Sequence, residues 1–266
     1  MTISGSIAAL NLIATSTSEA AIAYNELDKL IYAVDKSNGS YRTLNPNTTV
    51  WGPVTLINAT VQQIVRAAIN ADGKLLISSQ SANTIYDVDL ATQNVGIFDS
   101  YSPTPGGDIA FGSDGALYHV SREGGISLFL TIPQELASEI LLGNVRALVT
   151  GIANTFSNQL ILSSHNASSL AVLNYNGSMS TPINLSLNDA PFTSTFGDLA
   201  LGCAEDEPAV ECNYALYYVH TFQSGSSSLR SVALNNDGTA TTNVLLNNTS
   251  GHIALSHDGN TVYLVG

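Results

Sequence analysis

One unit recurs six times along the chain: a short strand of small apolar residues, a turn, and a second strand that is strongly apolar. The central residues of the first strands mark the six copies, and they are Ile22, Ala67, Ile109, Ile152, Leu199 and Ile253. Successive landmarks are separated by 45, 42, 43, 47 and 54 residues. Such self-similarity indicates a repeat architecture, in which neighbouring units together bury a continuous core.

The repeat length is typical of one four-stranded blade of a β-propeller. Asp-Gly pairs at 72–73, 114–115 and 258–259 lie between first and second strands, where tight hairpin turns belong. The segments 84–90 and 169–173 alternate apolar and polar residues, as expected for third strands. We therefore predict an all-β protein in which residues 1–266 form a single six-bladed β-propeller domain.

The last copy of the repeat ends at Gly266 after only two strands, so its remaining strands must come from elsewhere in the chain. Residues 4–12 resemble residues 38–45, which have the position of a third strand. We therefore expect residues 1–17 to complete the last blade. This closure joins the two ends of the chain by β-pairing and leaves no open edge between the first and last blades.

Two segments depart from the repeat. Residues 133–143 begin with a proline, carry two glutamates early and end on a glycine, which predicts a short helical insertion. Residues 202–213 form an acidic loop insertion that is bounded by Cys203 and Cys212. We expect these two cysteines to form a disulfide; the alternative is two free thiols in a reducing compartment.

The composition limits where the protein acts and what it binds. Only 11% of the residues are charged, so the polar surface must come from Ser, Thr, Asn and Gly, which favours an extracellular or cell-surface location. A net charge of −13 with eight Lys plus Arg excludes nucleic acids and anionic membranes as partners. No apolar run is long enough for membrane insertion. A protein or glycan partner is expected, and the chain is expected to be a monomer or part of a larger chain.

The innermost strand of each propeller blade lines the central axis, and its first residue lies at the mouth where ligands usually bind. Alignment of the copies places six residues at this position: Ala21, Arg66, Asp108, Gly151, Asp198 and His252. Two carboxylates suit a hard cation such as Ca²⁺, and a histidine suits a metal ligand or general base. The alternative interpretation is a structural network in which Arg66 pairs with Asp108, because buried charges normally occur in pairs.

A second set of polar residues is expected at the ends of the second strands, on the same face of the ring. These rim candidates are Asp35, Gln80, Arg122, His165 and His220. The alternative is that they are solvated loop positions. We assign His119 a structural role, because it lies inside a predicted strand.

By its repeats the chain resembles the six-bladed β-propeller superfamily, which includes NHL-type and YVTN-type repeat proteins and, more distantly, gluconolactonase-like enzymes. The resemblance covers essentially the whole chain. It implies a divalent metal in the central channel, a role that falls here on Asp108 and Asp198 only. The glutamate that these enzymes carry near the start of the first blade is replaced by Ala21.

No catalytic sequence motif for a nucleophile elbow, a zinc protease or a phosphate-binding loop is present. The function that we predict is an extracellular binding or interaction module, as one domain of a secreted or surface protein. One alternative is a metal-dependent hydrolase or lactonase with its site at the mouth of the central channel. The other is a structural domain of an adhesin or surface layer.

Overall fold

The protein is known from a computed structural model. It describes residues 20–57, 61, 63–70, 72–79, 84–100, 108–111, 116–120, 125–129, 140–144, 149–154, 159–164, 169–174, 183–184, 195–203, 214–221, 227–234, 240–249, 251–255 and 262–265. All regular structure in these residues is β-strand, and every strand pair is antiparallel. No helix long and apolar enough to cross a membrane occurs among them.

The described strands form five four-stranded sheets and one two-stranded sheet, which we number in chain order. Sheet 1 contains β1 (Ala20–Asn25), β2 (Leu30–Asp35), β3 (Tyr41–Asn45) and β4 (Val50–Trp51). Sheet 2 contains β5 (Ile64–Ile69), β6 (Leu75–Ser79), β7 (Thr84–Val88) and β8 (Val95–Ser100). Sheet 3 contains β9 (Ile109–Phe111), β10 (Leu117–Val120), β11 (Gly125–Phe129) and β12 (Ile140–Asn144).

The second half of the chain repeats this order. Sheet 4 contains β13 (Val149–Asn154), β14 (Gln159–Ser164), β15 (Ser169–Asn174) and β16 (Ile183–Asn184). Sheet 5 contains β17 (Thr195–Cys203), β18 (Tyr214–Thr221), β19 (Ser227–Leu234) and β20 (Ala240–Asn247). Sheet 6 contains β21 (His252–Leu255) and β22 (Val262–Val265).

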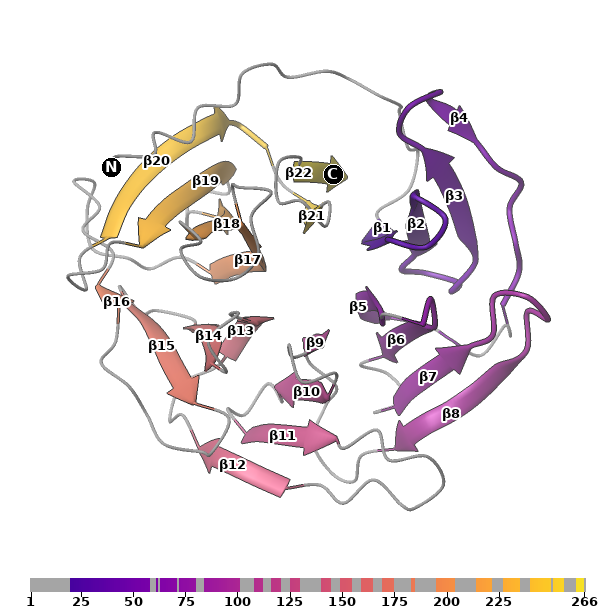
Figure 1. Ribbon diagram of the computed structural model, residues 1–266, viewed down its shortest axis with the longest axis horizontal. Helices are drawn as coiled ribbons and strands as arrows, with labels where there is room; N and C mark the ends of the chain where they lie inside the picture. Colours follow the sequence, from indigo (N-terminus) through magenta and orange to yellow (C-terminus); the bar gives the residue numbers. More distant parts are fainter. Residues whose placement is uncertain are drawn as a thin grey trace.

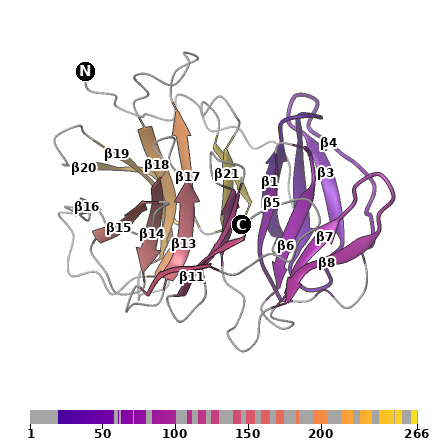
Figure 2. The same cartoon turned by 60° about the horizontal axis from the view of Figure 1, so that its bottom comes forward.

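The sheets stand around a common axis, which is the arrangement of a β-propeller (Figure 1). The first strand of every sheet is innermost. These strands contact one another in the order β1, β5, β9, β13, β17 and β21, and β21 also contacts β1. Figure 2 shows β1, β5, β13 and β17 running along this axis. The all-β propeller predicted from the repeats is therefore confirmed.

The core lies between neighbouring sheets and follows the two-residue period of the strands. In β1, Ala21 and Ala23 pack toward sheet 2, in one cluster with Leu75 and Ile77. The alternate residues of β1 pack toward sheet 6, in a cluster that contains Ala254. β1 is thus buried on both faces, and this explains why it consists of small apolar residues.

Four hairpin turns share one five-residue form and begin at Asn25, Asp35, Asn45 and Asp89. The side-chain Oδ1 of each first residue accepts a hydrogen bond of 2.8–3.0 Å from the backbone N–H two residues later. The backbone carbonyl of the same residue accepts a hydrogen bond from the N–H four residues later, at 2.7–2.9 Å. Short polar side chains that satisfy the backbone locally favour turns over strand continuation.

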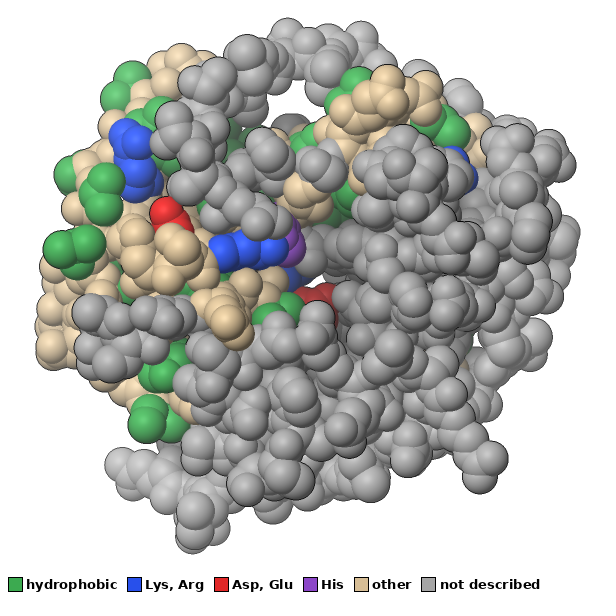
Figure 3. Space-filling view, turned by 180° about the vertical axis from the view of Figure 1, so that it is seen from behind, with side chains coloured by type: hydrophobic (Ala, Val, Ile, Leu, Met, Phe, Trp, Pro, Cys, Tyr) green, Lys and Arg blue, Asp and Glu red, His purple; other side chains and the backbone are tan. Residues whose placement is uncertain are grey.

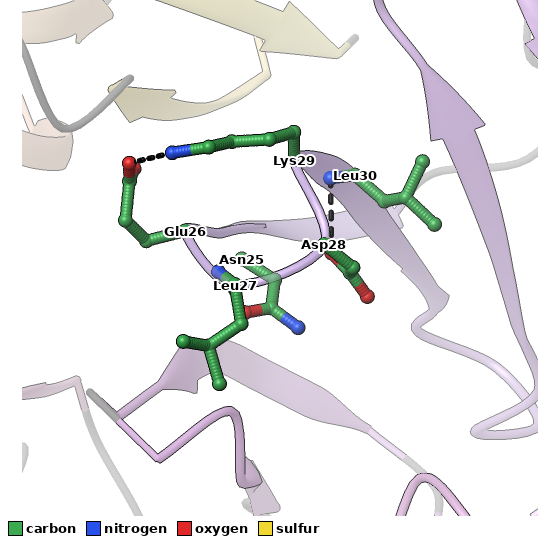
Figure 4. Close-up of polar contacts among 6 residues, drawn as sticks. All are labelled: Asn25, Glu26, Leu27, Asp28, Lys29 and Leu30. Carbon is green, nitrogen blue, oxygen red and sulfur yellow. Dashed lines mark hydrogen bonds and ion pairs between the residues drawn. The ribbon is translucent and has the colours of Figure 1, made fainter.

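The fifth residue of each such turn has a positive φ: Lys29 60°, Gly39 74°, Thr49 58° and Gln93 60°. In the first turn Asp28 Oδ1 also accepts a hydrogen bond from the N–H of Leu30, and Lys29 pairs with Glu26 (Figure 4). The turn at Asp72-Gly73 is of the tighter predicted type, with Gly73 at a φ of 80°.

The helix predicted over residues 133–143 is wrong where the structure describes it. Residues 140–144 form β12, which pairs with β11 and sets Ile140 opposite Leu128 and Gly143 opposite Ile126. A short apolar run does not distinguish strand from helix, and pairing with β11 satisfies its backbone groups. Residues 133–139 lie outside the described residues.

The loop predicted over residues 202–213 is shorter than expected. β17 continues through Cys203 and β18 begins at Tyr214, which lies opposite Cys203 in the hairpin. Gly202 and Cys203 therefore belong to a strand, because the β17–β18 ladder extends to the end of the hairpin. Cys212 lies outside the described residues, so the disulfide stays a prediction.

Candidate functional site

The six residues predicted to line the axial mouth lie on the innermost strands or directly beside them. Ala21, Arg66, Gly151 and Asp198 are within β1, β5, β13 and β17, Asp108 directly precedes β9, and His252 begins β21. We call this set the axial ring. Because the innermost strands neighbour one another in a cycle, Arg66 and Asp108 come from adjacent strands, and Ala21 lies between His252 and Arg66 in ring order.

Three of these positions are marked by a backbone irregularity that the sequence analysis did not anticipate. The register of the innermost strand shifts between Ile64 and Arg66, between Val149 and Gly151, and between Phe196 and Leu199. A β-bulge inserts one extra residue and locally redirects the side chains of its strand. The axial ring is therefore built where three inner strands bend.

The packing of β5 determines the direction of Arg66. Ala67 belongs to the cluster shared with sheet 1, and Ala68 packs with Ile109 and Leu117 of sheet 3. Because side chains alternate along a strand, Arg66 lies on the face toward sheet 3. Its Nε is 3.5 Å from Asp108 Oδ1, and the two side chains are only 12% and 5% exposed.

The side chain of His252, like that of Arg66, lies toward the next sheet in the order around the ring. Ile253 packs against sheet 5, in a cluster with Val219 and Leu229, and Ala254 packs against sheet 1. His252 therefore lies on the face toward sheet 1. Seen from behind the view of Figure 1, basic, histidine and acidic side chains gather at the hollowed centre of the molecule (Figure 3).

The described part of the axial ring does not fit a divalent metal. Asp108 Oδ1 accepts the backbone N–H of Ile109 at 2.9 Å and also faces the guanidinium of Arg66. A hard cation needs about six oxygen ligands, and a neighbouring guanidinium repels it. The described residues contain no group of three or more His, Cys, Asp or Glu side chains suited to a metal. The side chain of Asp198 lies outside this description.

Two of the rim candidates occupy the predicted places along the chain. Asp35 ends β2 and His220 lies one residue before the end of β18, whereas Gln80, Arg122 and His165 lie outside the described residues. Asp35 is half-buried, and its Oδ1 accepts hydrogen bonds from the backbone and hydroxyl of Ser37. It therefore has a turn-forming role. The side chains of the other four lie outside the description, so their binding role stays a prediction.

His119 is 1% exposed in β10, as its assignment to the interior predicts. Burial disfavours the charged imidazolium and lowers the pKa of His119 from 6.5 to about 4. The folded state therefore holds this side chain neutral.

We expect the free energy of unfolding to fall by about 3 kcal/mol through His119 as the pH drops from 6.5 to 4, because only the unfolded chain gains the proton. This contribution is fully present above the pKa of the unfolded state and is lost toward the pKa of the folded state. Urea unfolding of the parent and His119→Gln at pH 7, 5.5 and 4 measures it. An equal loss of stability in both proteins would contradict the assignment.

A buried arginine in sheet 5 was not identified from the sequence. Arg230 is 3% exposed, and its Nε donates a hydrogen bond to Ser228 Oγ at 2.9 Å. It lies opposite Tyr218, whose pKa burial raises to about 12. The available signal was the alternation of Leu229, Arg230 and Ser231 within an apolar strand that is buried on both faces. Arg230 and Ser228 therefore stabilise sheet 5 on its third strand, β19, and do not belong to the axial ring.

A groove of about 580 Å³ lies at the β5–β6 and β7–β8 turns of sheet 2, beyond the opposite end of β5 from Arg66. Its charged residues are used within the protein: Lys74 pairs with Asp87, and Asp89 caps the turn that follows it. Hydrogen bonds from the backbone and side chain of Thr92 lower the pKa of Asp89. The axial ring includes a guanidinium, two carboxylates and an imidazole, and we therefore place the candidate site there.

No protein-family model and no curated protein matches the chain. Its fold matches that of an inactive histidine-to-alanine virginiamycin B lyase from Staphylococcus aureus with quinupristin, at a TM-score of 0.66 and 14% identity, over 96% of this chain and 80% of that one. A gluconolactonase from Xanthomonas campestris matches at a TM-score of 0.68 and 13% identity, over 95% and 84%.

A chain of a nidogen/laminin complex also matches, at a TM-score of 0.61 and 15% identity, over 84% of this chain and 78% of that one. At these identities the comparisons establish the fold alone. Together with the ring of sheets, they show that the chain has a β-propeller fold, which it shares with the virginiamycin B lyase and the gluconolactonases.

Proposed function

We propose that this protein is an enzyme that hydrolyses a lactone or a related ester at the axial ring. The observation that supports the proposal is the buried pair of Arg66 and Asp108 beside a cycle of innermost strands that also includes β21, which His252 begins. The neighbours that match over nearly the whole chain include a lyase and gluconolactonases, which favours an enzyme over the binding module predicted from composition.

His252 is the candidate general base. It would take a proton from a water molecule whose oxygen attacks the carbonyl carbon of the lactone. The ring carbon–oxygen bond then breaks, and the leaving alkoxide takes the proton back from the imidazolium, so that the product is the hydroxy acid. A histidine suits this exchange because it accepts and releases a proton near neutral pH.

The test is hydrolysis of two probes, glucono-δ-lactone and quinupristin, by the purified protein at pH 7. We expect a mass gain of one water on at least one probe, at a rate well above buffer alone. The Lys74→Gln variant is the matched control, since Lys74 lies in the turn that follows the opposite end of β5 from Arg66 and pairs with Asp87. Rates equal to buffer with both probes and with a set of simple aryl esters would overturn the proposal.

The second candidate is an interaction module on an extracellular protein. The Arg66–Asp108 pair favours this candidate, since a buried ion pair near the axis can have a purely structural role. The nidogen/laminin match also favours it, because that structure is a protein complex. In that case the partner would be a protein or glycan, and Cys203 and Cys212 would form a disulfide. Thiol titration of the unfolded, unreduced protein checks the disulfide, and two titratable thiols would exclude it.

We further propose that the ring has six blades and that residues 1–17 complete the one begun by β21 and β22. Residues 4–11 match residues 38–45, which include β3, and Gly5 corresponds to Gly39. At Gly39 a Cβ would lie 2.9 Å from Val61 Cβ, so a side chain is disfavoured there. Trp51, which packs against sheet 6, has a buried Nε1 without a hydrogen-bond partner among the described residues.

Removal of residues 1–17 is expected to lower the thermal midpoint by more than about 5 °C. Sheet 6 then loses a strand, and the two ends of the chain are no longer joined by β-pairing. Calorimetry of the shortened protein measures this shift. A synthetic peptide of residues 1–17 should restore part of the loss, whereas a scrambled peptide should not. An unchanged midpoint after truncation would refute the closure.

A further inference from the structure

The axial ring needs a source of positive charge if it is to polarise an ester carbonyl. The resemblance to gluconolactonase-like enzymes assigns that task to a divalent metal ion. We propose instead that Arg66 is the resident cation of this site and that the ring takes no divalent metal. The catalytic consequence rests on the proposed function, but the charge assignment concerns the folded protein and is tested without turnover.

The first support is the state of Asp108. Its side chain is 5% exposed, and its Oδ1 already faces two donors, the N–H of Ile109 at 2.9 Å and Arg66 Nε at 3.5 Å. A carboxylate that is buried against a guanidinium has its charge balanced within the protein. A divalent ion at the same carboxylate would have to displace Arg66 or accept its repulsion.

The second support is the small number of possible metal ligands at the other positions of the axial ring. Ala21 occupies the position where the resemblance expects a glutamate, and it is fully buried. Gly151 offers no side chain at its position. Of the six positions only Asp108 and Asp198 carry carboxylates, whereas Ca²⁺ takes six to eight oxygen ligands and Mg²⁺ demands an octahedron. This donor set is too poor for Ca²⁺, and Mg²⁺, which one or two carboxylates and several waters can hold, would have to compete with Arg66 for Asp108.

The third support is the chemistry of a guanidinium. Arginine stays charged at every relevant pH and carries five N–H donors on a planar fork. It can therefore be held by a carboxylate on one edge and still present charge to a second oxygen. Since Asp108 forms a buried ion pair with the guanidinium, we assign Asp108 the role of a positioning residue for Arg66.

The net charge of the protein limits which classes of ligand can bind at the axial ring. At a net charge of −13, the long-range field repels multiply charged anions such as phosphates. One guanidinium that is already paired with a carboxylate does not offset that field. The ligand oxygen that suits Arg66 is therefore the carbonyl of a neutral ester or lactone.

The test compares thermal midpoints of the parent and Asp108→Asn in EDTA and in 1 mM Ca²⁺, Mg²⁺, Mn²⁺ or Zn²⁺, with isothermal titration of the same ions. We expect the metal-induced shift to be the same in both proteins, within about 1 °C. A metal-induced stabilisation of the parent that disappears in Asp108→Asn would overturn the proposal. Because the readout is the thermal midpoint, failure to hydrolyse any ester would leave this result interpretable.

A second measurement tests Arg66 directly by chemical rescue. In Arg66→Ala, about 10 mM guanidinium is expected to raise the thermal midpoint by about 2 °C or more, because it binds beside Asp108 in the vacated space. Methylammonium at the same concentration and ionic strength lacks the planar fork and should not do so. Equal effects of the two ions, or no effect of either, would contradict the assignment of Arg66.

Discussion

Replacing Arg66 by methionine is expected to lower the free energy of unfolding by about 3 kcal/mol at pH 7. Methionine keeps much of the buried volume but leaves the carboxylate of Asp108 without its cation at 5% exposure. Removing one partner of a buried pair costs more than the pair contributes, because the remaining charge stays desolvated. Urea unfolding with linear extrapolation measures the change.

The matching double variant, Arg66→Met with Asp108→Asn, should recover a large part of this loss, because no uncompensated charge then remains. Arg42→Met is the matched control, since Arg42 is exposed and lies 5.0 Å over the ring of Trp51. We expect that control to cost about 1 kcal/mol at most. Additive effects of the two single substitutions would mean that Arg66 and Asp108 do not interact.

Replacing His252 by glutamine is expected to lower kcat/KM for the responsive probe by about 10²- to 10⁴-fold, the usual contribution of a positioned general base. Glutamine is similar in size and can donate a hydrogen bond, but it does not accept a proton near pH 7. The thermal midpoint should change little, since His252 is half-buried at the mouth of the ring.

Steady-state kinetics of His252→Gln beside Lys74→Gln separates this effect from a general loss of activity. A variant whose kcat falls with KM unchanged would assign His252 to the chemical step. A rise of KM alone would assign it to binding. Activity within about threefold of the parent would exclude His252 as the general base. The second candidate function, an interaction module, would then be favoured.

Local patterns predicted most of the fold. The small-residue strands around Ile22, Ala67, Ile109 and Ile253 became innermost strands because only such residues pack between two sheets. The turns were less well predicted. The Asp-Gly turn predicted at residues 72–73 is confirmed, whereas four further turns, which begin with Asn or Asp and place Lys29, Gly39, Thr49 or Gln93 at positive φ, were not predicted. The signal was present in the ten-residue spacing of Asn25, Asp35 and Asn45.

The error in the predicted helix over residues 140–143 has a physical cause. Proline, early acidic residues and a final glycine are helix signals, but the free energy of a short segment is decided by the partner that it meets. In this protein β11 presents an unpaired edge, and Ile140–Asn144 completes it as β12. No local pattern contains that edge.

The sequence by itself determined the repeat, the identity of the innermost strands and the short list of residues at equivalent axial positions, because these depend on periods of two and of about forty-five residues. Only the tertiary structure decided that Arg66 meets Asp108, that β5, β13 and β17 shift register near the ring, and that Arg230 is buried. The physical reason is that contacts between sheets join residues far apart in the chain. Their distances follow from how neighbouring sheets pack, which no local period encodes.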